Sequence, residues 1–113
     1  MKKELRYLEK HKALCGFADY KLLLKDSTSH DSGDVVAEAE GDYLDKTLTV
    51  TLFKKYTTTK DWKNVLIHEL VHARFGLALD KIKDRTKDIA YLEEEEAVND
   101  ITRGIMSLLE SEK

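Results

Sequence analysis

The residues best suited to chemistry lie in one pentapeptide, His68-Glu69-Leu70-Val71-His72, which has the pattern H-E-x-x-H. Histidines four residues apart project from the same face of a helix, one turn apart. Both imidazoles can then bind one Zn²⁺ ion with Zn–N bonds of about 2.0–2.1 Å. Glu69 is offset from that line, so it can reach a zinc-bound water without binding the metal. Because zinc lowers the pKa of this water to about 7, Glu69 can accept its proton as the water attacks a carbonyl.

The alternative interpretation is that the histidines are hydrogen-bonded residues of an apolar core. Segment 60–75 is apolar on nearly every side, with Leu66 and Leu70 on one side and Ile67 and Val71 on another, which predicts a helix inside the domain. Two histidines and a glutamate are unfavourable there unless something satisfies them. An accidental match to the pattern is also expected in only a few chains per thousand, roughly, of this length. We therefore favour a metal site.

A catalytic zinc site needs a third protein ligand, and the candidates are four consecutive glutamates of the last predicted helix, Glu93, Glu94, Glu95 and Glu96. Most of them are expected to form a solvated acidic face. Glu94 is our first choice because it continues the apolar stripe of Val98, Ile101, Ile105 and Leu108. Glu96 is second, because Asp100 follows one turn later and can orient a ligating histidine. Glu93, at the margin of the stripe, and Glu95, which points away from it, are less favoured.

Helices and strands must position these residues within an α+β fold. We predict an N-terminal helix over 2–15 that stops at Gly16, and a long last helix over 89–109. Strands are predicted over 18–25, 35–43 and 47–53, forming a small twisted antiparallel or mixed sheet of about three strands, arranged as a meander. The helix that carries the histidines is predicted to begin at Lys60, capped by Thr58 or Thr59, and to stop at Gly76. A charged connection, partly helical, is expected over 77–87.

Composition limits the class of protein. A chain of 113 residues is the size of one domain. Its 19 Lys and Arg against 22 Asp and Glu give a net charge of −3, which provides no electrostatic basis for binding nucleic acid. One cysteine, Cys15, cannot form an internal disulfide, and no apolar run has the length of a membrane span. We expect a soluble, cytoplasmic protein with no membrane partner.

The H-E-x-x-H helix followed by a glutamate-bearing helix resembles the zincin metallopeptidases of the glutamate-ligand, or gluzincin, type. Glu94-x-x-Ala97 is similar to the pattern of the ImmA/IrrE-type peptidases and related small phage-encoded proteins, whereas Glu96 with Asp100 is similar to the pattern of thermolysin-like enzymes. The small size fits the first group better. The resemblance implies one zincin-like domain over 1–113 that hydrolyses peptide or protein substrates as a zinc metalloendopeptidase. It also implies His68, His72 and Glu94 as ligands of one Zn²⁺ ion and Glu69 as the general base.

The zincin topology also implies an edge strand above the cleft that pairs with the extended substrate main chain. The strand over 35–43 is the candidate, and its Glu38, Glu40 and Asp42 either prevent aggregation or give a preference for basic peptides. No residue is assigned to stabilise the transition state; Tyr91, Tyr56 and His30 are guesses. Two rival functions therefore stay open, namely a metal-binding regulatory module without efficient proteolysis and a metal-free helical interaction protein.

Overall fold

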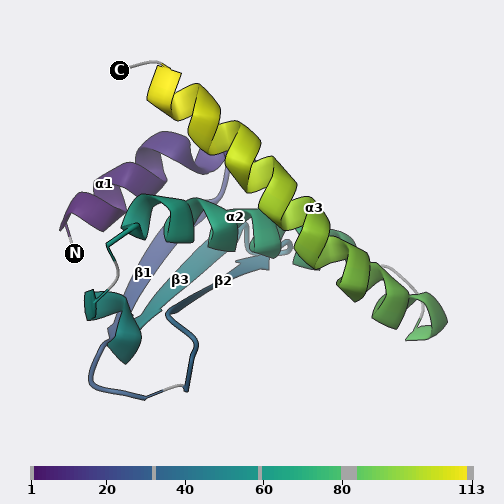
Figure 1. The fold of residues 1–113 in the computed structure, drawn as a ribbon, viewed down its shortest axis with the longest axis horizontal. Helices are drawn as coiled ribbons and strands as arrows, with labels where there is room; N and C mark the ends of the chain where they lie inside the picture. Colours follow the sequence, from purple (N-terminus) through teal and green to yellow (C-terminus); the bar gives the residue numbers. More distant parts are fainter. Residues whose placement is uncertain (1, 32, 59, 80–83, 112–113) are drawn as a thin grey trace.

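The computed structural model describes residues 2–31, 33–58, 60–79 and 84–111. Within these residues it contains three α-helices, two short 3-10 helices and one three-stranded mixed sheet. The elements in chain order are α1 (Lys2–His11), η1 (Lys12–Cys15), β1 (Lys21–Ser27), β2 (Ala37–Asp42), β3 (Thr47–Phe53), η2 (Lys54–Thr58), α2 (Trp62–Leu79) and α3 (Asp84–Ser111) (Figure 1). The predicted α+β class and three-stranded sheet are confirmed.

The strand order is β1-β3-β2, with β1 parallel and β2 antiparallel to the central strand β3. Strands β2 and β3 form a hairpin, as a meander would require, and Lys46 in its turn has a φ of 54°. The predicted meander is wrong, because β1 pairs with β3 instead of with β2. The central place of β3 has a physical reason. Leu48, Val50 and Leu52 are at most 1% exposed, so burial between two neighbouring strands stabilises this strand most.

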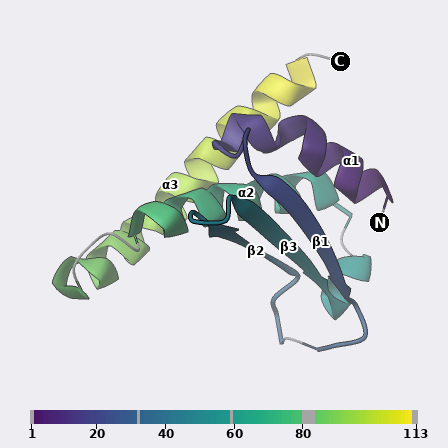
Figure 2. The ribbon, with the colours of Figure 1, turned by 180° about the vertical axis from the view of Figure 1, so that it is seen from behind.

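Helix α2 packs on one face of the sheet (Figure 2), and the buried side chains of Leu48, Val50 and Leu52 belong to the core between them. The buried residues of α2, among those whose burial the structure describes, join the strand residues in a single core; they are Leu66, Ile67, Leu70, Val71 and Ala73. The N-terminal helix α1 lies against the start of α2, where the rings of Tyr7 and Trp62 meet at 5.3 Å between centroids. Trp62 therefore packs at the margin of the core, where it is half-buried.

One predicted helix end is confirmed and two are wrong. Gly16 follows η1 with a φ of 86°, in the left-handed region that glycine tolerates, so the predicted stop is confirmed. Gly76 does not end α2, which continues in helical conformation to Leu79. The last helix begins at Asp84, five residues before the predicted start at Ile89, so the expected connection is shorter. The predicted cap Thr59 lies outside the described residues, and Thr58 ends η2.

Helix α3 crosses α2, to which it is antiparallel, and extends beyond the core (Figure 1). From Glu94 onward, where the structure describes its side chains, the buried residues are Glu94, Val98 and Thr102, which follow one another at intervals of four. The predicted apolar stripe is wrong at Ile101, which is 42% exposed, and at Leu108, which is 64% exposed, whereas Ile105 is half-buried and packs against the core. The face of α3 that packs on α2 thus includes a carboxylate and a hydroxyl group.

Candidate metal centre

Helix α2 presents His68 and His72 side by side. The two ring centroids lie 4.6 Å apart, with an interplanar angle of 73°. Hydrophobic residues next to the histidines in α2 are buried. The two histidine side chains themselves keep 23% and 25% of their surface exposed. The histidines therefore lie at the margin of the core. The apolar character of the helix had predicted a position deep inside it. A catalytic metal site needs such an opening for water and substrate.

Glu95 of α3 brings its carboxylate between the two histidines. One oxygen, Oε1, lies 3.6 Å from His68 Nε2, and the other, Oε2, lies 3.2 Å from His72 Nε2. One donor atom from each of the three residues can be chosen so that all lie within 4.8 Å of one another. Ligand atoms about 2.05 Å from a tetrahedral zinc ion are about 3.3 Å apart, which is close to the two measured distances.

Glu94 occupies a different place beside the same histidine. Its Oε1 lies 3.3 Å from His72 Nδ1, on the side of the ring away from Glu95, and its side chain is buried. A carboxylate at Nδ1 holds the ring in one orientation and leaves Nε2 free to bind a metal. The geometry thus favours Glu95 as the third ligand and Glu94 as the partner that orients His72. The sequence prediction of Glu94 as a ligand stays a prediction.

The other predicted partners lie elsewhere. Glu96 is exposed and does not belong to the three-residue group. Asp100, which was expected to orient a histidine, forms an ion pair with Arg103 on its own helix. The side chain of Glu93 lies outside the part of the chain that the structure describes. Periodicity did not single out Glu95, because periodicity marks the centre of the buried stripe of a helix. His68 and His72 lie at the margin of the buried stripe of α2.

The protonation states suit metal binding and proton transfer. Burial, followed by the charge of His72, lowers the pKa of His68, so its imidazole is neutral at neutral pH and keeps a lone pair for a metal. Burial raises the pKa of Glu69 to about 7, against the opposing effect of His72. A carboxyl group with a pKa near neutrality is well matched to general base and general acid catalysis.

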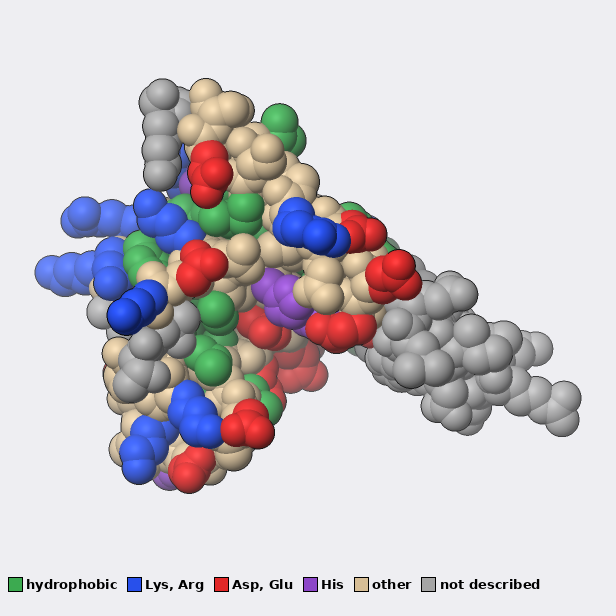
Figure 3. Space-filling model, in the orientation of Figure 1, with side chains coloured by type: hydrophobic (Ala, Val, Ile, Leu, Met, Phe, Trp, Pro, Cys, Tyr) green, Lys and Arg blue, Asp and Glu red, His purple; other side chains and the backbone are tan. Residues whose placement is uncertain are grey.

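A cleft of about 740 Å³ lies in front of these residues. One wall is the segment 34–40, which includes the first four of the six residues of β2, and the other wall is α2 with Glu95. Its α2 residues are Asn64, Val65, His68, Glu69 and His72. The predicted edge position of this strand is confirmed, since β2 pairs only with β3 in the described sheet. In Figure 3 the histidine surface at the middle of the molecule is bordered by acidic side chains.

Three residues were guessed to stabilise the transition state. Those whose side chains the structure describes do not line the cleft. Tyr56 is buried and donates a hydrogen bond of 2.8 Å to Glu4 Oε2, and His30 lies in an exposed loop. The side chain of Tyr91 lies outside the described part of the chain. Asn64, which the sequence did not single out, lines both the cleft and a smaller adjoining pocket that includes Arg103. Its position one turn before His68 was the available signal.

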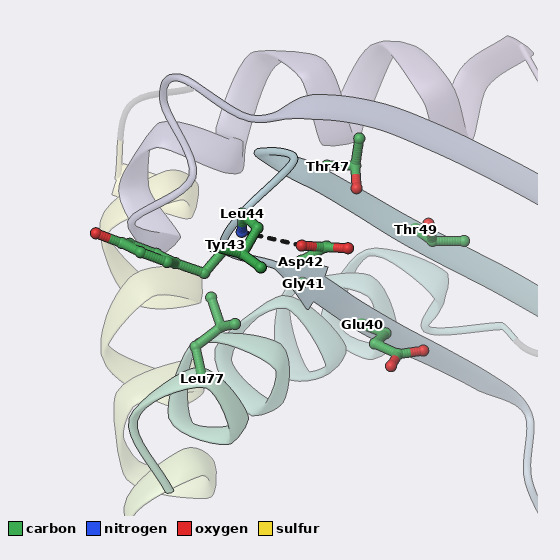
Figure 4. Close-up of a pocket in the computed structure, with 8 residues that line it drawn as sticks. All are labelled: Glu40, Gly41, Asp42, Tyr43, Leu44, Thr47, Thr49 and Leu77. Carbon is green, nitrogen blue, oxygen red and sulfur yellow. Dashed lines mark hydrogen bonds between the residues drawn. The ribbon is translucent and has the colours of Figure 1, made fainter. Parts of the chain in front are cut away.

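A second hollow lies where β2 and β3 turn into each other, next to Leu77 of α2 (Figure 4). There the Asp42 carboxylate accepts hydrogen bonds from the backbone N–H groups of Leu44, at 3.0 Å, and Asp45, at 3.1 Å. Asp42 is therefore engaged in holding the turn. Glu40 lines both this hollow and the cleft, so the two are neighbours along β2.

Comparison with known protein families, with curated proteins and with solved structures gave no match to this chain. Among the described helices, each is too short or too polar to cross a membrane.

Proposed function

We propose that this protein is a zinc-dependent metalloendopeptidase with a minimal zincin-like fold. The observation that carries the proposal is the convergence of His68 Nε2, His72 Nε2 and the Glu95 carboxylate beside Glu69, on the floor of a cleft whose wall is an edge strand. Two imidazoles and one carboxylate, with room for a water, form a donor set typical of catalytic zinc. When bound, zinc would supply a Lewis acid that acidifies water and polarises a carbonyl group.

Glu69 would act as the general base and then as the general acid. Glu69 lines the cleft and does not belong to the three-residue group, so its carboxylate would be available to move protons. It would accept a proton from the water that attacks the peptide carbonyl, and would then give that proton to the leaving amine. The raised pKa of Glu69, caused mainly by burial, supports both steps.

The other residues of the cleft would hold the substrate and the ligands in place. The free edge of β2 offers unpaired backbone groups to an extended peptide, which would add to the sheet as a further strand. Glu94 would fix the ring of His72. Asn64 lines the cleft, and its side-chain amide would donate a hydrogen bond to the substrate carbonyl. The lone thiol Cys15, which is free and buried, supports a reducing, cytoplasmic setting.

The experiment compares the zinc-loaded protein with its Glu69→Gln variant on a fluorescently labelled unfolded protein such as casein. The wild type should release labelled peptides only with zinc present. The variant should still bind zinc, but its rate of peptide release should be at least about a hundredfold lower. Equal rates in both proteins would remove the peptidase proposal. If both proteins bind zinc and neither cleaves, the rival function of a metal-binding regulatory module is favoured, as the lack of a described Tyr or His helper in the cleft suggests.

A further inference from the structure

The free edge of β2 carries two kinds of side chain on its two faces. Ala37 is buried and Ala39 half-buried, and both belong to the side that packs toward α2. Glu38 and Glu40 alternate with them, point to the opposite face of the sheet and are exposed. A peptide that adds to this edge would place every second side chain next to these carboxylates.

The charges of Glu38 and Glu40 are not balanced by their neighbours in the sheet. In the register of β2 with β3, Glu38 lies opposite Thr51 and Glu40 lies opposite Thr49, as Figure 4 shows for the second pair. Neither carboxylate has an ion pair among the described residues. Asp34, by contrast, is 2.7 Å from the amino group of Lys55.

The cleft itself adds no positive side chain. The residues that line it include Asp34, Glu38, Glu40, Glu69 and Glu95 and no Lys or Arg. A zinc ion on the two histidines would offset the charge of Glu69 and Glu95, and Lys55 offsets that of Asp34. What remains is a pair of negative charges, spaced two residues apart on the strand that would receive the substrate.

We infer that the preferred substrate is an extended peptide with Lys or Arg at two alternating positions and an apolar residue between them. The basic side chains would lie beside Glu38 and Glu40, and the apolar side chain would enter the cleft between Ala39 and Val65. This inference rests on the proposed function, since it names the substrate class of the same site. Opposite charges directly across neighbouring strands favour pairing by about two- to fivefold per pair.

Charged residues on an edge strand also prevent aggregation, which is the competing explanation for both glutamates. The two explanations differ in one respect. Protection against aggregation requires charge of either sign and gives no preference among peptides. Substrate selection requires that removal of these two carboxylates abolish a preference for basic peptides, while removal of two other surface carboxylates does not.

The test uses two fluorescein-labelled peptides that are identical except for Lys or Glu at two alternating positions around a leucine. Binding is measured by fluorescence anisotropy with the zinc-loaded Glu69→Gln protein, which should bind without cleaving. The Lys peptide should bind about tenfold more tightly at about 0.05 M NaCl, and the ratio should shrink at about 0.5 M NaCl. Adding Glu38→Gln and Glu40→Gln should bring the ratio below about two.

A matched control replaces Glu9 of α1 and Glu110 of α3 by Gln, which removes two exposed carboxylates away from the cleft. This control should keep the tenfold ratio. Equal binding of both peptides, or an equal effect of the two pairs of substitutions, would overturn the inference. Cleavage of both peptides by wild type with no charge preference would also overturn it while leaving the proposed function intact. A binding preference without cleavage by wild type would instead remove the peptidase activity and keep the recognition.

Discussion

Replacing each of two neighbouring glutamates separately tests the division of roles on α3. Glu95→Gln removes the carboxylate whose oxygens lie 3.6 Å from His68 Nε2 and 3.2 Å from His72 Nε2. Glu94→Gln removes a carboxylate on the far side of the His72 ring, 3.3 Å from Nδ1. The first change should therefore remove a metal ligand, whereas the second should weaken the orientation of a ligand.

The expected magnitudes differ by about one order. Zinc sites with four protein ligands bind with about 10–16 kcal/mol, so one ligand contributes about 3 kcal/mol, which is about 150-fold in affinity. Loss of a partner that orients a ligating histidine weakens metal binding by about 10–100-fold. Because Gln keeps one oxygen that can accept a hydrogen bond from Nδ1–H, Glu94→Gln should fall near the lower end, about tenfold.

The assay is competition for zinc between each variant and a chromophoric chelator of known affinity, at constant pH and salt. Glu96→Gln is the matched control, because Glu96 is exposed and does not belong to the three-residue group. Its zinc affinity should stay within about twofold of wild type. Circular dichroism of each metal-free variant checks that the helices persist. A larger loss for Glu94→Gln than for Glu95→Gln would refute the assignment and restore Glu94 as the ligand.

Three further predictions concern the scaffold. Gly16→Ala should lower the free energy of unfolding in urea by about 1 kcal/mol, because the φ of 86° is unfavourable for alanine; an unchanged midpoint would contradict this. Tyr56→Phe should lower it by about 1–3 kcal/mol, because the buried hydrogen bond to Glu4 is lost, without a change in zinc affinity. Burial raises the pKa of Cys15 to about 11, so the contribution of the neutral thiol to stability is complete below about pH 9 and is lost as the pH rises through 11. Stability should therefore fall less over this range in Cys15→Ala than in wild type, and parallel curves would count against the buried thiol.

The sequence predicted the elements better than their pairing. Alternating residues such as Leu48, Val50 and Leu52 predicted β3 with its observed bounds, because one buried face leaves a local period of two. The partner of β1 could not be predicted in this way. Strand order depends on which strand is stabilised most by a neighbour on each side. That stabilisation is a property of the whole sheet and not of one segment.

The candidate site was predictable on α2 and less so on α3. The spacing of His68 and His72 predicted their shared face, since both lie on one helix. The third ligand depends on how two helices cross, and a buried stripe marks only the centre of that contact. Glu94 is buried at the centre of this contact, where its carboxylate lies beside His72 Nδ1. Glu95 lies at the margin of the contact and faces the rings of both His68 and His72.

The most direct test of the central claim is zinc X-ray absorption on the loaded protein. The account predicts two imidazole nitrogens and a carboxylate oxygen, each about 2.0–2.2 Å from zinc, with one imidazole lost in His72→Ala. A protein that retains no zinc after gel filtration, or a zinc spectrum that is unchanged by His72→Ala, would contradict it.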